Sequence, residues 1–345
     1  MKLLDASPTE SVTDLPTLEA RLRRISNRPR VLTAEEYLRL SGEEREVYDD
    51  ARMLYLNRDL TVDTPAVKAA LTDIRRLLLT NYGKPAGRHG LLLSGPSLVG
   101  KTHTAFAILH AAMNRYLADY PEPRAEGRIP LVYLEVPAVA TAKSMMQQFC
   151  NFLGIPRGPR YTLEELTYMA TQIMLRGKTA LIVVDEVHNL SSTSKNTRDA
   201  IRALKGLSNV LPATFIYCGL NLEGNDLLTG DEGMQIAGRF TLRRMLPHSY
   251  GSSDARDNWT STVEAFESGL GLIKSEGRCL EGEEEYLFSR TNGSIGSLGF
   301  LLRAAAIELL FADSIHEHGE ERITRELLDS IPLDIAAERG AIAES

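Results

Sequence analysis

Short apolar runs alternate with longer amphipathic stretches through the middle of this chain. Four short, mostly apolar runs predict buried β-strands, over residues 90–94, 131–136, 179–184 and 213–218. The stretches after them have apolar residues at helical spacing and predict helices, over residues 102–117, 142–153, 163–175 and 194–204. Strands that alternate with helices of this length form a parallel sheet with right-handed crossovers. The pattern therefore predicts an α/β fold with a parallel β-sheet core flanked by helices.

The chain before this region is predicted to be helical or irregular. Residues 1–30 are polar with alternating charge, which indicates a short helix or a partly disordered arm. Two capping boxes, at Thr33 and Ser41, predict helices within residues 33–59. The apolar stripe of these helices is typical of a structural cap on the core, or else of an arm that docks a partner.

After about residue 255 the chain becomes mostly helical. Helices are predicted over residues 259–270, 283–290, 298–311 and 324–331. This run of helices predicts a small helical domain that follows the α/β domain in sequence. The predicted divisions are an N-terminal helical arm or cap (1–60), the α/β domain (61–250), a small helical lid domain (251–332) and a polar tail (333–345).

Composition narrows the class of protein. Of the 345 residues, 43% are hydrophobic and 25% are charged, which is typical of a soluble globular protein. No apolar run approaches the roughly 18 residues of a membrane helix, and the N-terminus is too polar for a secretory signal. We therefore expect a cytoplasmic protein without a membrane partner. The net charge of −7 argues against a generally basic surface but leaves room for a local basic stripe.

The first predicted strand leads into a glycine-rich loop that ends in Gly-Lys-Thr. This is the G-x-x-x-x-G-K-[ST] phosphate loop in its required context of strand, loop and helix. Lys101 would place its charge on the β- and γ-phosphates of ATP, and Thr102 would be a ligand of Mg²⁺. The predicted nucleotide-binding residues are Gly95, Pro96, Ser97, Leu98, Val99, Gly100, Lys101, Thr102 and His103.

A second motif follows the most apolar strand. Asp185 and Glu186 stand at its carboxyl end, where open α/β sheets bind their ligands. Asp185 would hold Mg²⁺ together with Thr102, and Glu186 would orient and deprotonate the attacking water. A polar residue after the neighbouring strand would contact the water or the γ-phosphate. Asn221 is the candidate and Cys218 the alternative.

A basic residue is also needed to stabilise charge on the γ-phosphate. Arg239 is the candidate for an arginine finger offered to a neighbouring subunit. The same residue could simply cover apolar surface with its side chain. Arg243 and Arg244 lie close by and are alternatives for the finger.

With these motifs in place, the chain resembles an AAA+ P-loop ATPase, and more closely the TniB/TnsC group of transposition ATPases, relatives of IstB and of the origin-recognition initiators. The resemblance covers roughly residues 60–310. It depends on four segments, residues 63–65 (Asp-Thr-Pro), residues 88–95 before and into the phosphate loop, residues 185–190 (Asp-Glu-Val-His-Asn-Leu) and residues 238–240 (Gly-Arg-Phe).

The resemblance implies a function on DNA. ATPases of this group assemble on double-stranded DNA as ATP-bound rings or helical filaments, recruit a transposase and a target-selection protein, and disassemble on hydrolysis. Their site lies between subunits, which favours Arg239 as a finger acting in trans. Segments after the second strand grip DNA in this group, and the matching positions here are Thr141, Lys143, Arg157 and Arg160. Such residues would bind phosphates without selecting a base sequence.

The chain departs from this group at one position. Many relatives have a basic residue at the start of the lid helix that senses the γ-phosphate, but here no Arg or Lys follows the turn at residues 292–296 until Arg303. We therefore expect slow hydrolysis, or sensing by Arg303. Two other functions remain open at this point, an AAA+ signalling or defence-type switch outside transposition, and a scaffold that binds ATP without hydrolysing it. Glu186 argues against the scaffold.

Overall fold

The structure is a computed structural model that describes residues 11–25, 28–57, 62–85, 87–138, 140–156, 161–190, 195–224, 237–274, 277–335 and 337. The chain divides into two compact units, and each is built from separate stretches of sequence. Unit 1 comprises Met1–Arg23, Ala70–Pro96 and Thr104–Met245. Unit 2 comprises Arg24–Ala69, Ser97–His103 and Leu246–Ser345.

Unit 1 is built on a five-stranded parallel sheet. The strands are β1 (Gly90–Ser94), β2 (Leu131–Glu135), β3 (Leu181–Asp185), β4 (Thr214–Gly219) and β5 (Phe240–Arg244). Their order in the sheet is β2-β3-β4-β1-β5, and every pair is parallel. The first four strands confirm the predicted ones to within two residues at either end. The predicted α/β fold is therefore correct.

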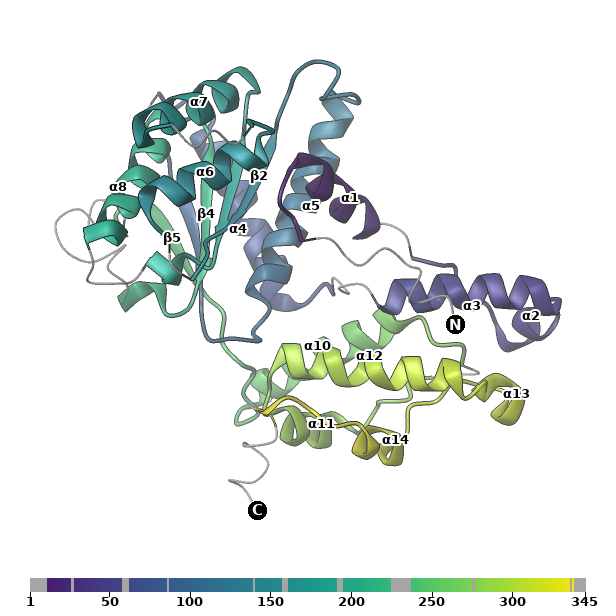
Figure 1. The fold of residues 1–345 in the computed structure, drawn as a ribbon. Coiled ribbons are helices and arrows are strands. Elements are labelled where there is room, and N and C mark those ends of the chain that lie inside the picture. The colour runs from purple at the N-terminus through teal and green to yellow at the C-terminus, as the bar shows by residue number, and fades with distance from the viewer. Residues whose placement is uncertain are drawn as a thin grey trace. The chain divides into compact units, whose positions relative to one another are not determined.

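Every residue of β1, β3 and β4 is buried, as expected for strands covered on both faces. The helices that contribute to this unit are α1 (Leu15–Ile25), α4 (Pro65–Asn81), α5 (Lys101–Asp119), α6 (Ala142–Phe152), α7 (Leu163–Arg176) and α8 (Lys195–Val210). Helix α6 packs against both α7 and α8, and these three helices lie together (Figure 1).

Strand β5 was not predicted from the sequence. It forms one edge of the sheet, its residues are intermediate or exposed, and it has no apolar run of its own. Its partner β1 determines its conformation, through a register that sets Gly90 beside Phe240 and Ser94 beside Arg244. The Phe240 ring stacks on Tyr217 of β4, with centroids 4.8 Å apart. A Cβ at Gly90 would overlap this ring, so the strand pair needs glycine there.

Unit 2 is helical. Its helices are α2 (Ala34–Leu38), α3 (Gly42–Leu56), α10 (Ser253–Leu270), α11 (Glu284–Thr291), α12 (Ile295–Phe311), α13 (Ser314–His318) and α14 (Arg325–Ser330). Helix α12 is at the centre, and it contacts α3, α10, α11 and α14 (Figure 1). The core of unit 2 contains the buried side chains of Trp259, Leu298 and Leu302 together with Leu56 and Val62 from the N-terminal part of the chain.

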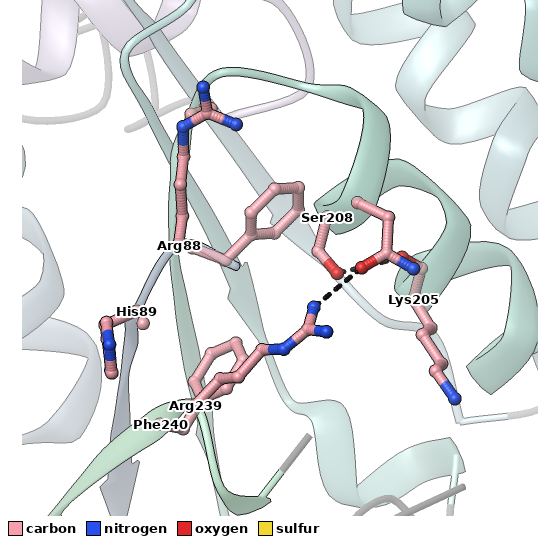
Figure 2. Close-up of a pocket in the computed structure, with 10 residues that line it drawn as sticks. Arg88, His89, Lys205, Ser208, Arg239 and Phe240 are labelled. Atoms are coloured by element: carbon pink, nitrogen blue, oxygen red, sulfur yellow. Dashed lines mark hydrogen bonds between the residues drawn. The ribbon is translucent and has the colours of Figure 1, made fainter. Parts of the chain in front are cut away.

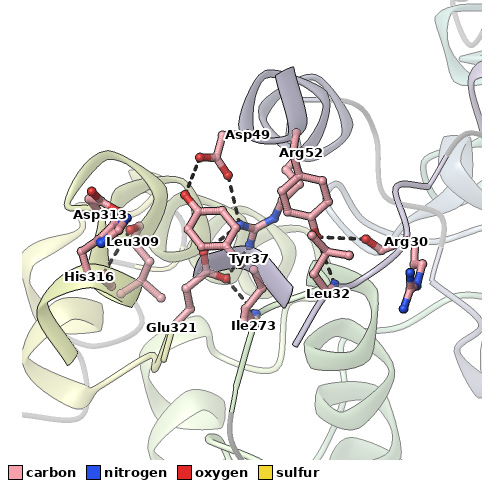
Figure 3. Close-up of polar contacts among 12 residues, drawn as sticks. Arg30, Leu32, Tyr37, Asp49, Arg52, Ile273, Leu309, Asp313, His316 and Glu321 are labelled. Carbon is pink, nitrogen blue, oxygen red and sulfur yellow. Dashed lines mark hydrogen bonds and ion pairs between the residues drawn. The ribbon is translucent and has the colours of Figure 1, made fainter. Parts of the chain in front are cut away.

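Helices α2 and α3 thus belong to the same unit as the C-terminal helices. The capping boxes predicted at Thr33 and Ser41 are both present and start α2 and α3. Arg52 of α3 forms a buried, bidentate ion pair with Glu321, with 2.8 Å between Nη1 and Oε1 (Figure 3). Glu321 Oε2 also accepts a hydrogen bond from the Ile273 backbone, 2.8 Å away. Residues before position 60 therefore contribute to the core of the helical unit.

Among the residues that the structure describes, no single helix is long and apolar enough to cross a membrane. The pair α11 and α12 passes the same test on length and composition, but it is bent by 114°.

Candidate nucleotide site

Three strands bring the predicted site residues of unit 1 to one edge of the sheet. The register pairs Ser94 with Gly219, so β1 and β4 end side by side, and Asp185 is the last residue of β3 on the other side of β4. The backbone N–H of Gly95, the first residue of the phosphate loop, donates to the Gly219 carbonyl at 3.3 Å. The start of the loop, the acidic pair and the loop after β4 therefore share the carboxyl edge, where ligands of such sheets bind.

The phosphate loop has the backbone that an anion site requires. Leu98 (φ 61°) and Gly100 (φ 84°) both adopt the left-handed conformation, two residues apart. Turns of this kind direct successive N–H groups to one side and form an anion-binding concavity. Lys101 is the first residue of α5 and is only 7% exposed. The loop and the positive end of the α5 dipole thus fit a nucleotide polyphosphate, with Thr102 next to Lys101 as the candidate Mg²⁺ ligand.

Within unit 2, the loop is held by the start of α12. The Leu98 carbonyl accepts hydrogen bonds from the Gly296 N–H at 2.8 Å and from the Ser294 hydroxyl at 3.4 Å. A Cβ on Gly296 would lie 2.9 Å from both Cβ and the carbonyl oxygen of Leu98. A side chain at Gly296 is therefore sterically excluded while this contact with Leu98 is kept. Arg303 lies two helical turns further on, roughly 10 Å along the axis.

Asp185 is only 1% exposed, and both oxygens of its carboxylate accept hydrogen bonds. Tyr133 Oη donates to Oδ2 at 3.2 Å, and the Glu186 N–H donates to Oδ1 at 2.8 Å. Burial, followed by the nearby Asp185 charge, raises the pKa of Tyr133, so this phenol remains a hydrogen-bond donor. Burial and the charges of Asp185 and Glu186 also raise the pKa of Glu135, the last residue of β2. A cation such as Mg²⁺ would relieve this clustering of negative charge.

Glu186 is held in a strained backbone conformation. Its φ is 55°, which is uncommon for any residue with a Cβ, and its carbonyl accepts from the Asn189 N–H at 2.9 Å. The side chain is 35% exposed, and its Oε2 lies 3.2 Å from Nδ1 of His188. His188 was not among the predicted site residues, and its only signal in the sequence is its place in the Asp-Glu-Val-His-Asn-Leu segment.

The loop after β4 carries the two candidates for a γ-phosphate contact. Asn221 is exposed and has a φ of 41°, two residues beyond the end of the strand. Cys218, the alternative, lies inside β4 and is completely buried, so it is in the wrong place for a residue at the strand tip. The next residues of the loop are fixed to β1, because the Leu222 N–H donates to Ser94 Oγ at 2.9 Å and Ser94 Oγ donates to Glu223.

Arg239 lies at the opposite end of the sheet, where the strands begin. Its carbonyl accepts from the Gly90 N–H at 3.0 Å, at the start of β1, so four strand residues or about 13 Å separate it from Ser94. Its guanidinium Nη1 donates to Oδ1 of Asn209 on α8 at 2.8 Å, in a pocket that Arg88 and Lys205 also line (Figure 2). At this distance Arg239 cannot reach the carboxyl edge of its own sheet, whereas a role toward a second copy is compatible with its place.

The alternatives to Arg239 are engaged in ion pairs. Arg243 Nε lies 2.8 Å from an Asp73 carboxylate oxygen, and Arg244 Nε lies 2.9 Å from Oε1 of Glu223. Both guanidinium charges are therefore neutralised within the chain, while Arg239 binds a neutral amide.

The predicted DNA contacts are only partly described. Thr141 is the N-cap of α6, and its hydroxyl accepts from the Ser144 N–H at 3.0 Å. Lys143 is exposed in the first turn of the same helix. Arg157 and Arg160 lie outside the described residues.

Comparisons with known proteins agree with this architecture. The family described as Bacterial TniB protein matches residues 52–250. The structure is similar to the Aeropyrum pernix ORC1 protein in complex with DNA, with a TM-score of 0.56 at 17% identity, over 81% of this chain and 68% of that one. It is also similar to the ORC2 protein of the same organism in ADPNP–ADP complexes, with a TM-score of 0.51 at 10% identity, over 76% of this chain and 65% of that one. No curated protein matches the sequence significantly.

The family match covers more than half of the chain, and the parallel sheet, the phosphate loop and the helical unit agree with the AAA+ fold of the initiator structures. The resemblance inferred from the motifs is therefore confirmed. The chain belongs to the TniB family and is an ATPase with the AAA+ fold.

Proposed function

We propose that this protein is an ATP-dependent DNA-binding ATPase that assembles with copies of itself on DNA and regulates transposition. One observation carries the proposal. The nucleotide motifs begin at the carboxyl edge of the sheet, while Arg239 lies about 13 Å away at the amino edge. A site that uses this arginine needs a second copy of the chain, so catalysis would depend on assembly.

Each motif has a proposed role in hydrolysis. Lys101 and the loop N–H groups would bind the phosphates, and Thr102 and Asp185 would hold Mg²⁺, whose positive charge would offset that of the transferred phosphoryl group. Glu186 accepts a proton from the attacking water. Asn221 contacts that water or the γ-phosphate, and Arg239 of a neighbouring copy stabilises the transition state. Tyr133 keeps the Asp185 carboxylate oriented through its hydrogen bond.

The DNA-related part of the proposal draws on the relatives. The TniB family name, and the DNA complex of the ORC1 structure, support duplex DNA as the platform. With a net charge of −7, binding must depend on local cations such as Lys143, and on Arg157 and Arg160 further along the chain. Recruitment of a transposase and a target-selection protein would follow assembly, and hydrolysis would drive disassembly.

The test uses the Glu186→Gln variant, which retains every phosphate ligand but lacks the base. We expect it to bind ATP without hydrolysing it and to form rings or filaments on duplex DNA with ATP but not with ADP. Co-sedimentation and negative-stain imaging measure this. Lys101→Ala is the matched control, and it should neither bind nucleotide nor assemble. A Glu186→Gln protein that remains monomeric and indifferent to DNA with both nucleotides would contradict the proposal and favour a signalling switch.

A further inference from the structure

The imidazole of His188 lies between the proposed base and the loop after β4. Its Nδ1 lies 3.2 Å from Oε2 of Glu186 and 3.4 Å from the backbone nitrogen of Leu220. Leu220 directly precedes Asn221, the proposed γ-phosphate contact. One nitrogen atom therefore touches both halves of the proposed hydrolytic machinery in unit 1.

We infer that His188 is a positioning residue, whose Nδ1 binds either the Glu186 carboxylate or the Leu220 N–H and thereby couples the base to the Asn221 loop. The inference rests on the proposed role of Glu186. It follows from the chemistry of imidazole, because a ring nitrogen that carries a proton can only donate and one without a proton can only accept. The two contacts of Nδ1 therefore exclude each other.

Each state has a defined consequence for the site. With the proton on Nδ1, the ring donates to Glu186 and holds its carboxylate away from other partners. With the proton on Nε2, Nδ1 accepts from Leu220, the loop is fixed, and the Glu186 carboxylate is released to accept a proton from water. A change in the position of the Asn221 loop would thus change the freedom of the base.

The surroundings keep His188 in place for this role. Its neighbours Val187 and Leu190 are completely buried and anchor the short helix that carries it. The Asn189 side chain donates to the Val136 carbonyl at 2.8 Å, which fixes the same segment to the end of β2. A Cβ at Gly219 would lie 3.1 Å from the backbone nitrogen of His188 and 3.4 Å from its Nδ1. Glycine at this position therefore permits the end of β4 to lie close to His188.

The test compares His188→Ala with His188→Asn, because an Asn side chain places a group that can donate or accept near the position of Nδ1. Steady-state hydrolysis is measured in the assembled state on duplex DNA. We expect Ala to lower kcat between about 10- and 100-fold with KM for ATP nearly unchanged, since the Leu220 N–H loses its acceptor and the Asn221 loop is no longer held beside the base. Asn should recover most of the loss. If His188 had only a structural role, the two substitutions would lower kcat equally or would raise KM for ATP.

Glu186→Gln is assayed in parallel to separate the two claims. If Glu186→Gln is inactive while His188→Ala turns over like the wild type, only the role of His188 is overturned. If Glu186→Gln retains wild-type turnover, the proposed base itself is wrong. In the double variant, we expect His188→Ala to add no further loss to that of Glu186→Gln, because both act through one carboxylate. A full additional loss would overturn the coupling.

Discussion

At the scale of single residues, the nucleotide site is marked by backbone strain. Leu98, Glu186 and Asn221 each have a Cβ and a positive φ, and they belong to the phosphate loop, the acidic pair and the loop after β4. Such conformations persist only where the surroundings impose them, and they concentrate at functional sites. Here the surroundings include the Gly296 N–H on Leu98 and the Asn189 N–H on Glu186.

Gly296 gives the first prediction at this scale. The substitution Gly296→Ala would place a Cβ 2.9 Å from Leu98, so the start of α12 and the phosphate loop have to separate. We expect a loss of about 1–3 kcal/mol in the free energy of unfolding, and weaker ATP binding because Leu98 loses its hydrogen bond. Urea denaturation and nucleotide titration measure the two effects.

Gly206→Ala is the matched control for this substitution. Gly206 lies in α8, and a Cβ there meets nothing within 4 Å. Alanine in a helix interior is expected to stabilise the protein by about 0.5–1 kcal/mol without touching ATP binding. An equal response of the two variants would show that the close approach of Gly296 to Leu98 has no energetic importance.

Residues of fixed chemistry can be proposed from the sequence alone, whereas contacts between distant positions cannot. Lys101, Asp185 and Glu186 follow from motifs whose spacing the chemistry demands. The contacts of His188 with Leu220 and of Gly296 with Leu98 join positions that are distant in sequence. Local patterns carry no information about such contacts.

At the scale of helices and strands, how well the sequence predicts an element depends on how deeply that element is buried. Strands buried on both faces appear in the sequence as apolar runs, and β1 was predicted with its observed ends at residues 90 and 94. Edge strand β5 has no such run and exists because β1 pairs with it. Helix α8 extends to Val210, six residues beyond the predicted end at Leu204.

The ion pair between α3 and the segment before α14 gives a prediction at this scale. Arg52→Ala would leave Glu321 buried, charged and without its guanidinium partner, and Glu321 is 1% exposed. We expect the free energy of unfolding to fall by about 3–5 kcal/mol. Denaturant melts of the full chain, followed by the fluorescence of Trp259, the single tryptophan, in the core of unit 2, report on this unit.

The control for this pair is Arg39→Ala. Arg39 pairs with Glu35 one helical turn away, but both side chains are more than three-quarters exposed. Exposed pairs of this kind contribute well under ~1 kcal/mol to stability, so the midpoint of denaturation should change little. If Arg52→Ala were equally silent, the ion pair with Glu321 would contribute nothing to the stability of unit 2.

At the scale of the whole molecule, segments from both ends of the chain meet in unit 2. The helices before residue 60 were predicted as an arm or as a helical cap on the core. Leu56 and Val62 belong to a core whose other members come from beyond residue 245, and Arg52 pairs with Glu321. Such a grouping depends on contacts between the two ends of the chain. Local periodicity carries no information about contacts of this range.

The central claim is that each active site is completed by a second copy of the chain. The most direct test is the ATPase rate of a mixture of Arg239→Ala and Glu186→Gln proteins on duplex DNA. Each variant alone should lose about 1,000-fold or more in turnover. In the mixture, a site of the Arg239→Ala chain can receive Arg239 from a Glu186→Gln neighbour, so we predict that turnover returns to a substantial fraction of the wild-type rate. A mixture no faster than the sum of its two components would contradict the account.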